Sequence, residues 1–80
     1  MSSVKDLLGE SQYIEYKKVI YYEMGIILEN KKEFIQCSID DSKKRTRVID
    51  ICDFLYLEKD MENFDKMELV LKILEIKENI

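Results

Sequence analysis

The stretch that decides the fold is Asp65–Glu78, DKMELVLKILEIKE, the most apolar run in the chain. Its apolar side chains recur at the spacing of a helix, at Met67, Leu69, Val70, Leu71, Ile73, Leu74 and Ile76. On a helical wheel they cover an arc of roughly 220°. Asp65 and Glu68 have the form of a capping box, so the pattern predicts a helix that begins at Asp65.

A strand is the competing interpretation, because apolar residues also alternate at 67, 69, 71 and 73. The alternation breaks at Val70, Leu74 and Ile76, which are apolar on the other parity. We therefore favour the helix. Its wide apolar arc predicts either deep burial or a surface shared between the core and a partner.

The composition indicates one small domain, residues 1–80, without the common catalytic groups. An apolar content of 46% over 80 residues is enough for one core. Histidine is absent, which removes the commonest general base, the usual partner of a nucleophilic serine or cysteine, and most zinc chemistry. The only glycines are Gly9 and Gly25, too few for a glycine-rich phosphate loop. We expect no enzyme, no cofactor and no metal.

The sequence predicts a cytoplasmic protein. It has no apolar run long enough for a membrane span and no signal-peptide pattern at its start. Two cysteines without a secretion signal predict reduced thiols in the cytoplasm. Frequent lysine, isoleucine, glutamate and tyrosine, with no proline or tryptophan, are typical of an AT-rich genome, bacterial or viral.

Charge is distributed unevenly along the chain, whose formal net charge is −4. Residues 1–29 carry a net charge of −2, residues 30–47 carry +3, and residues 48–80 carry −5. A basic middle and an acidic final third affect association and solubility rather than fold.

The first two thirds of the chain are ambiguous between helix and strand. For residues 13–28, YIEYKKVIYYEMGIIL, we favour a helix through about Met24, followed by extended chain at 26–28. Residues 33–39 and 47–52 alternate like strands and would pair antiparallel across a polar loop at 40–47, DDSKKRTR. That pairing puts Cys37 and Cys52 on opposite faces, so we expect two buried thiols and no disulfide.

The fold that we favour is therefore α+β. A small antiparallel sheet from the middle of the chain would carry the N-terminal and C-terminal helices packed on it. The alternative is an all-α bundle of three or four helices, in which Asn30 and Glu33 cap a helix and another spans residues 48–58.

Three features are candidate partner-binding sites. The basic run contributes Lys43, Lys44, Arg45 and Arg47. Arginine suits carboxylate and phosphate because its planar fork donates two bonds at once. Tyr22 is a second candidate, since the wheel puts it opposite the apolar side and tyrosine is enriched at interfaces. The third is one edge of the C-terminal helix, with Leu69, Ile73 and Ile76.

Together these features favour a small non-catalytic protein-binding module. We expect a viral or mobile-element inhibitor or adaptor that occupies the surface of a protein partner, with self-association into a homo-oligomer. The alternative is a nucleic-acid-binding regulator that uses the basic loop at 43–47, although Asp40 and Asp41 just before it would repel phosphate. No membrane partner is expected.

Overall fold

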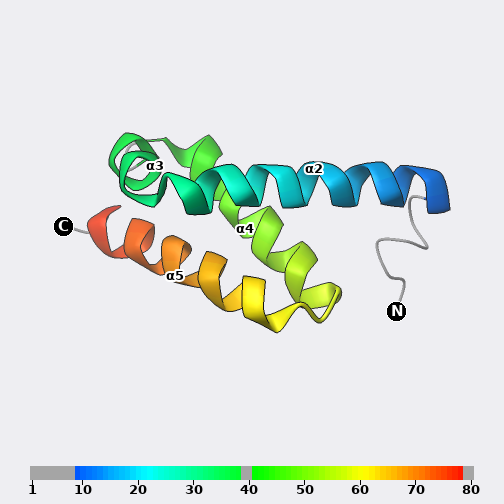
Figure 1. Cartoon of the computed structure of the whole chain (residues 1–80). Helices are drawn as coiled ribbons and strands as arrows, with labels where there is room; N and C mark the ends of the chain where they lie inside the picture. The colour runs from blue at the N-terminus through cyan, green and yellow to red at the C-terminus, as the bar shows by residue number, and fades with distance from the viewer. Residues whose placement is uncertain (1–8, 39–40, 79–80) are drawn as a thin grey trace.

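The chain folds as a bundle of α-helices in the computed structural model, which describes residues 9–38 and 41–78 (Figure 1). The elements in chain order are α2 (Glu10–Glu29), α3 (Lys31–Ser38), α4 (Ser42–Leu57) and α5 (Met61–Glu78). These two ranges contain no strand. The predicted α+β fold with a central sheet is therefore wrong, and the all-α alternative is the right one.

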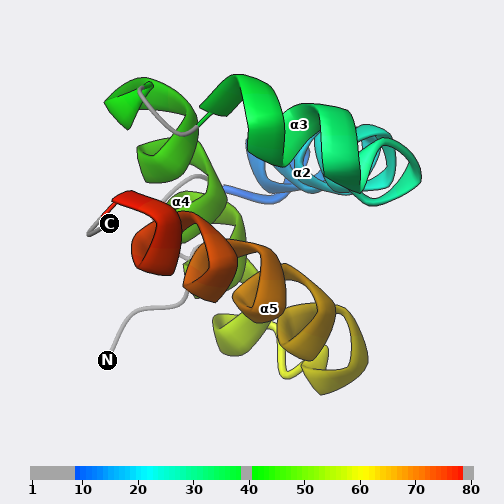
Figure 2. The same ribbon diagram turned by 90° about the vertical axis from the view of Figure 1, so that its left-hand side faces the viewer.

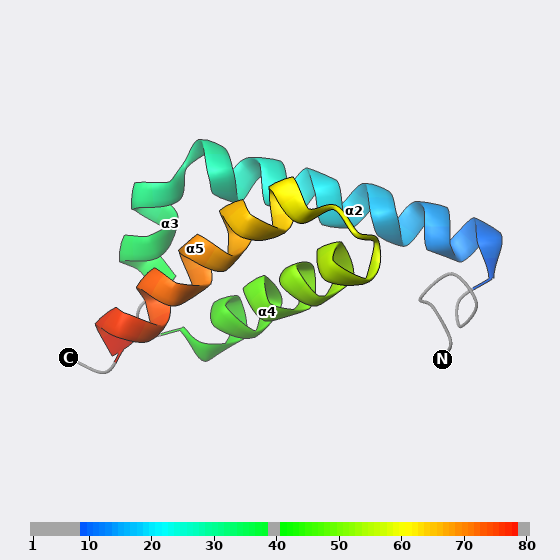
Figure 3. The ribbon, with the colours of Figure 1, turned by 90° about the horizontal axis from the view of Figure 1, so that it is seen from below.

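The helices form an elongated molecule of 41 × 24 × 23 Å. α4 and α5 lie side by side and run in opposite directions, with α2 against both (Figures 1 and 3). α3 turns back from the end of α2 and contacts each of the other helices (Figure 2). α2 has 20 residues, or about 30 Å. Its N-terminal turns project beyond the other helices, so part of α2 is a surface rather than a core element (Figure 3).

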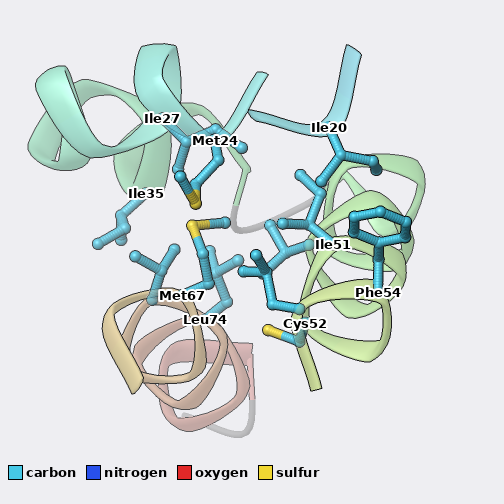
Figure 4. Packing of buried hydrophobic residues seen from close by; sticks show 12 residues of the cluster. Ile20, Met24, Ile27, Ile35, Ile51, Cys52, Phe54, Met67 and Leu74 are labelled. Carbon is cyan, nitrogen blue, oxygen red and sulfur yellow. The ribbon is translucent and has the colours of Figure 1, made fainter. Parts of the chain in front are cut away.

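One apolar core holds the bundle together, and every described helix contributes to it (Figure 4). Its buried members are Ile20, Met24, Ile27, Ile35, Val48, Ile51, Cys52, Phe54, Leu55, Met67, Val70 and Leu74. Partly buried tyrosines of α2 extend it, and the Tyr16 ring meets Phe54 edge-on at 5.2 Å. Such an aromatic pair adds about 1 kcal/mol beyond the area that it buries.

The predicted strands at 33–39 and 47–52 are helical where the structure describes them. The buried residues of α4 are Val48, Ile51, Cys52, Phe54 and Leu55. Val48, Ile51, Cys52 and Leu55 among them have helical spacing, which a window of six residues is too short to reveal. α3 buries Ile35 and leaves Cys37 exposed. Both cysteines are free thiols, so the expected lack of a disulfide agrees with the structure. The expected burial is right for Cys52 and wrong for Cys37.

Two helix boundaries also differ from the prediction. α2 continues through Gly25 to Glu29, so the expected extended chain at 26–28 is wrong. α5 confirms the predicted C-terminal helix but begins at Met61, before Asp65. The Asp60 side chain, not that of Asp65, accepts a hydrogen bond from a first-turn amide, Asn63 N–H, at 3.3 Å.

A tight turn joins α4 to α5 and places two carboxylates against α2. Lys59 adopts φ 61°, and its N–H donates to Tyr56 O at 3.1 Å while Asp60 N–H donates to Leu55 O at 3.0 Å. This pair of bonds is the Schellman motif, which ends a helix through one left-handed residue. The reversal holds Glu58 and Asp60 beside the tyrosines of α2.

Candidate partner-binding surface

The outer face of α2 carries three apolar side chains that the core does not use. Val19, Tyr22 and Ile26 are 46%, 70% and 45% exposed, and we call them the outer stripe. Their spacing of three and four residues puts them on one helix face, turned away from the buried Ile20 and Met24. Single exposed apolar residues are ordinary on a protein surface. Three on one face form a ridge of the kind that packs into the groove of a partner.

Two hollows with largely apolar walls flank the outer stripe. The first has a volume of about 470 Å³, and the described residues that line it are Ser11, Gln12, Glu15, Tyr16 and Val19. The second has a volume of about 190 Å³ and is lined by Glu23, Ile26, Ile27, Phe34, Lys44 and Arg47. Each end of the stripe thus borders a hollow, and the second hollow lies where α2, α3 and α4 meet.

The basic run 43–47 forms the first turns of α4 rather than a loop. The Asp41 side chain accepts hydrogen bonds from Lys43 N–H at 3.0 Å and Lys44 N–H at 3.3 Å. This N-cap satisfies two amides at the start of the helix and turns the polar run into helix. Lys43 and Lys44 are exposed, whereas Arg45 and Arg47 are partly buried.

An ion pair ties α4 to α2 at the rim of the second hollow. Arg47 Nε donates to Glu23 Oε2 at 2.5 Å, and Arg47 Nη2 donates to Glu23 Oε1 at 2.9 Å. The two hydrogen bonds raise the pKa of Arg47 against the opposing effect of burial. Lys44 lines the same hollow without an ion-pair partner among the residues described, and Lys43 does not line it.

The three residues of the predicted α5 edge differ in exposure. Leu69 and Ile76 are 56% and 62% exposed, whereas Ile73 is partly buried against the core. None of the three lines either hollow beside α2. The structure therefore brings Lys44 and Arg47 to α2 within a few residues of Tyr22, and it leaves the α5 edge as a separate surface.

Two phenol–carboxylate pairs fasten α2 to the turn between α4 and α5. The Tyr13 hydroxyl donates to Glu58, and the Tyr21 hydroxyl donates to Asp60 Oδ2 at 2.5 Å. The hydrogen bond to Glu58 raises the pKa of Tyr13 to about 12, and burial together with the bond to Asp60 raises that of Tyr21 to about 12. The bonds from Tyr21 and Asn63 lower the pKa of Asp60. These tyrosines are structural, which leaves Tyr22 as the exposed tyrosine of α2.

Within 9–38 and 41–78, no three His, Cys, Asp or Glu side chains gather as a metal-binding group. Burial raises the pKa of the Cys52 thiol to about 11, so it stays protonated at neutral pH and is a poor nucleophile.

Sequence reasoning missed Val19, Ile26 and Phe34 as site residues. Val19, Tyr22 and Ile26 share a face only if the helix continues past Gly25, and the predicted break after Met24 hid the pattern. Phe34 could not be found this way, because it joins the site through the packing of α3 on α2.

No protein-family model matches this chain, and no curated protein or solved structure is significantly similar to it. Function is therefore inferred from the surface of the molecule. None of the helices in the described ranges is long and apolar enough to cross a membrane.

Proposed function

We propose that this protein is a small non-catalytic protein-binding module that occupies a partner's surface with the outer face of α2. The observation that carries the proposal is the outer stripe of Val19, Tyr22 and Ile26. Helices that bind in a groove present anchors at this spacing, and tyrosine is among the residues that contribute most to binding energy.

The geometry of α2 supports this role. The helix is held to the rest of the bundle through its other face, so the outer stripe is presented by a rigid element. A preordered helix loses less conformational entropy on binding than a segment that folds on contact. The flanking hollows give a partner's side chains places to insert at both ends of the ridge.

We propose that the protein acts as an inhibitor or an adaptor, because occupying a partner's surface needs no catalytic group. The absence of histidine from the whole chain supports this assignment. Action in the cytoplasm is part of the proposal, supported by the free thiols of Cys37 and Cys52. Self-association and a viral or mobile-element origin stay predictions, with Leu69 and Ile76 as the candidate edge for a second copy.

The test is site-specific photo-crosslinking in the native host. A photoreactive phenylalanine analogue replaces Tyr22 in one variant and Tyr56, which is 60% exposed on α4, in a matched control. We expect protein adducts of defined mass at position 22 that are weak or absent at position 56. Changing Val19 and Ile26 to serine in the position-22 variant should remove them. Equal adducts at both positions, or none at position 22, would contradict the proposal.

Nucleic-acid binding is the second candidate, favoured by the exposed side chains of Lys43 and Lys44 at the start of α4. Arg47 supports it less, because its guanidinium is engaged by Glu23. Affinity for a DNA or RNA duplex that falls with salt, and that Lys43→Ala with Lys44→Ala abolishes, is the expected result. Affinity unchanged by this double substitution would reject the candidate.

A further inference from the structure

We propose that the second hollow, between α2, α3 and α4, is the anchor site for an acidic peptide segment of the partner protein. One aromatic or large aliphatic side chain of that segment would enter the hollow, and a neighbouring carboxylate would pair with Lys44. This inference rests on the proposed function and names the chemistry of the partner.

The size of the hollow points to a single side chain. Its volume is about 190 Å³. Sites for drug-sized ligands and cofactors measure roughly 300–1,000 Å³, whereas an apolar cavity of about 150 Å³ holds benzene. The hollow is therefore too small for a cofactor and large enough for a phenyl ring or a leucine side chain.

Three of the six side chains that line the hollow are apolar, and the core holds two of these in place. Ile26 and Ile27 come from α2, and Phe34 comes from α3. Ile27 belongs to the core, and Phe34 packs against it, so these walls do not depend on the ligand for their position. Burying a partner's aromatic or aliphatic side chain here removes apolar surface from water on both sides, which is the main source of affinity at such anchors.

The charge at the rim selects an acidic segment. The three charged side chains that line the hollow, Glu23, Lys44 and Arg47, sum to a net charge of +1. The pairing with Glu23 uses two of the five N–H donors of Arg47. Lys44 lines the hollow and has no ion pair among the residues described. The sequence segment 30–47, which supplies Phe34, Lys44 and Arg47 to the hollow, carries net +3 in a chain of net −4. Positive charge next to the hollow favours a carboxylate on the partner.

The test is an NMR titration of the full ¹⁵N-labelled chain with short peptides. The probe is a pentapeptide with blocked termini in which four glutamates surround one phenylalanine. One control peptide has alanine in place of phenylalanine, and the other has lysines in place of the glutamates. We expect the acidic phenylalanine peptide to shift the amide signals of Ile26, Ile27, Phe34 and Lys44, and to bind about fivefold or more tightly than either control.

A pair of charge reversals makes the test specific. Lys44→Glu should weaken binding of the probe about five- to tenfold, because it replaces one attraction with one repulsion. Lys43→Glu is the matched control, with the same charge change on the preceding residue outside the hollow, and should weaken binding less than about threefold. Both side chains are exposed, so both variants should keep the native spectrum.

Four results would overturn the inference. If Lys44→Glu and Lys43→Glu weaken peptide binding equally, the peptide is attracted by the general positive charge of this region and not by a site at the hollow. Equal binding by an oligonucleotide of the same charge would assign the hollow to nucleic acid. Concentration-dependent shifts at Ile26 and Lys44 without peptide would assign it to a second copy of the chain. If the peptide causes no shifts while the adducts at position 22 persist, the anchor site is wrong and the proposed function stands. Peptide binding without those adducts supports the anchor site and contradicts docking through the outer stripe.

Discussion

Replacing Gly25 with alanine should stabilise the protein, and the expected size of the effect follows from its position. Gly25 lies inside α2, and a Cβ built there meets no heavy atom within 4 Å. A methyl group therefore adds neither strain nor packing, and only the backbone contribution remains. Glycine in a helix interior is about 0.8–1.0 kcal/mol less favourable than alanine. We expect Gly25→Ala to raise the free energy of unfolding by about 1 kcal/mol, and the Tm by about 4–8 °C.

Urea unfolding followed by circular dichroism measures this difference, with Gly9→Ala as the control. The added Cβ at Gly9 also meets no atom within 4 Å, but Gly9 has φ +80° and ψ 163°, a conformation that side chains disfavour. Gly9→Ala should therefore destabilise the protein by about 1 kcal/mol. The same chemical change then has opposite signs at the two positions. If Gly25→Ala is neutral or destabilising at an unchanged m-value, α2 does not continue through residue 25, and the outer stripe does not share one face.

Three further predictions concern side chains. In the native protein a thiol reagent should modify Cys37 at once and Cys52 only on unfolding, because Cys52 is 4% exposed and its pKa is raised to about 11. Rapid modification of both thiols in the native protein would contradict the packing of α4. The pKa of Asp60 is lower in the folded protein than in the unfolded chain, where it is about 4. The ionised carboxylate therefore stabilises the fold above about pH 4, and this stabilisation is lost as the pH falls through the lowered pKa of the folded state. Between pH 6 and pH 3 the wild type should thus lose more stability in urea than Asp60→Asn, and an equal loss would contradict the assignment. A double-mutant cycle of Glu23→Ala and Arg47→Ala should give a coupling of about 0.5–1 kcal/mol that falls with salt, since both side chains are 34% exposed; no coupling at low salt would show that the pair does not form in solution.

The candidate site was only partly predictable from the sequence. The exposure of Tyr22 follows from its position opposite the apolar side of its helix, and the structure places it at 70% exposure. The basic run is visible in the sequence as a charge pattern, but its helical geometry does not follow from that pattern. Asp41 caps it into a helix, and Glu23 from α2 engages Arg47. Capping depends on neighbouring residues, whereas a pairing across 24 residues of sequence depends on the fold.

Within the C-terminal helix the sequence determined the element but not its surface. The 14-residue run from 65 to 78 is long enough for helical and strand periodicities to diverge, and the structure confirms a helix there. Its wide apolar arc does not say which edge is covered. Packing against the bundle decided that Ile73 is partly buried while Leu69 and Ile76 are exposed.

The sequence by itself determined a histidine-free chain with one core, a helix at its C-terminal end and an uneven charge. It did not determine the state of 33–39 and 47–52, because a window of six or seven residues satisfies both periodicities and the local preference for either is small. Tertiary structure decided those segments, since as helices they bury Ile35, Val48, Ile51 and Cys52 in one core with α2 and α5. The hollow at the junction of α2, α3 and α4 also exists only in the packed bundle, because its walls and its charged rim come from three helices.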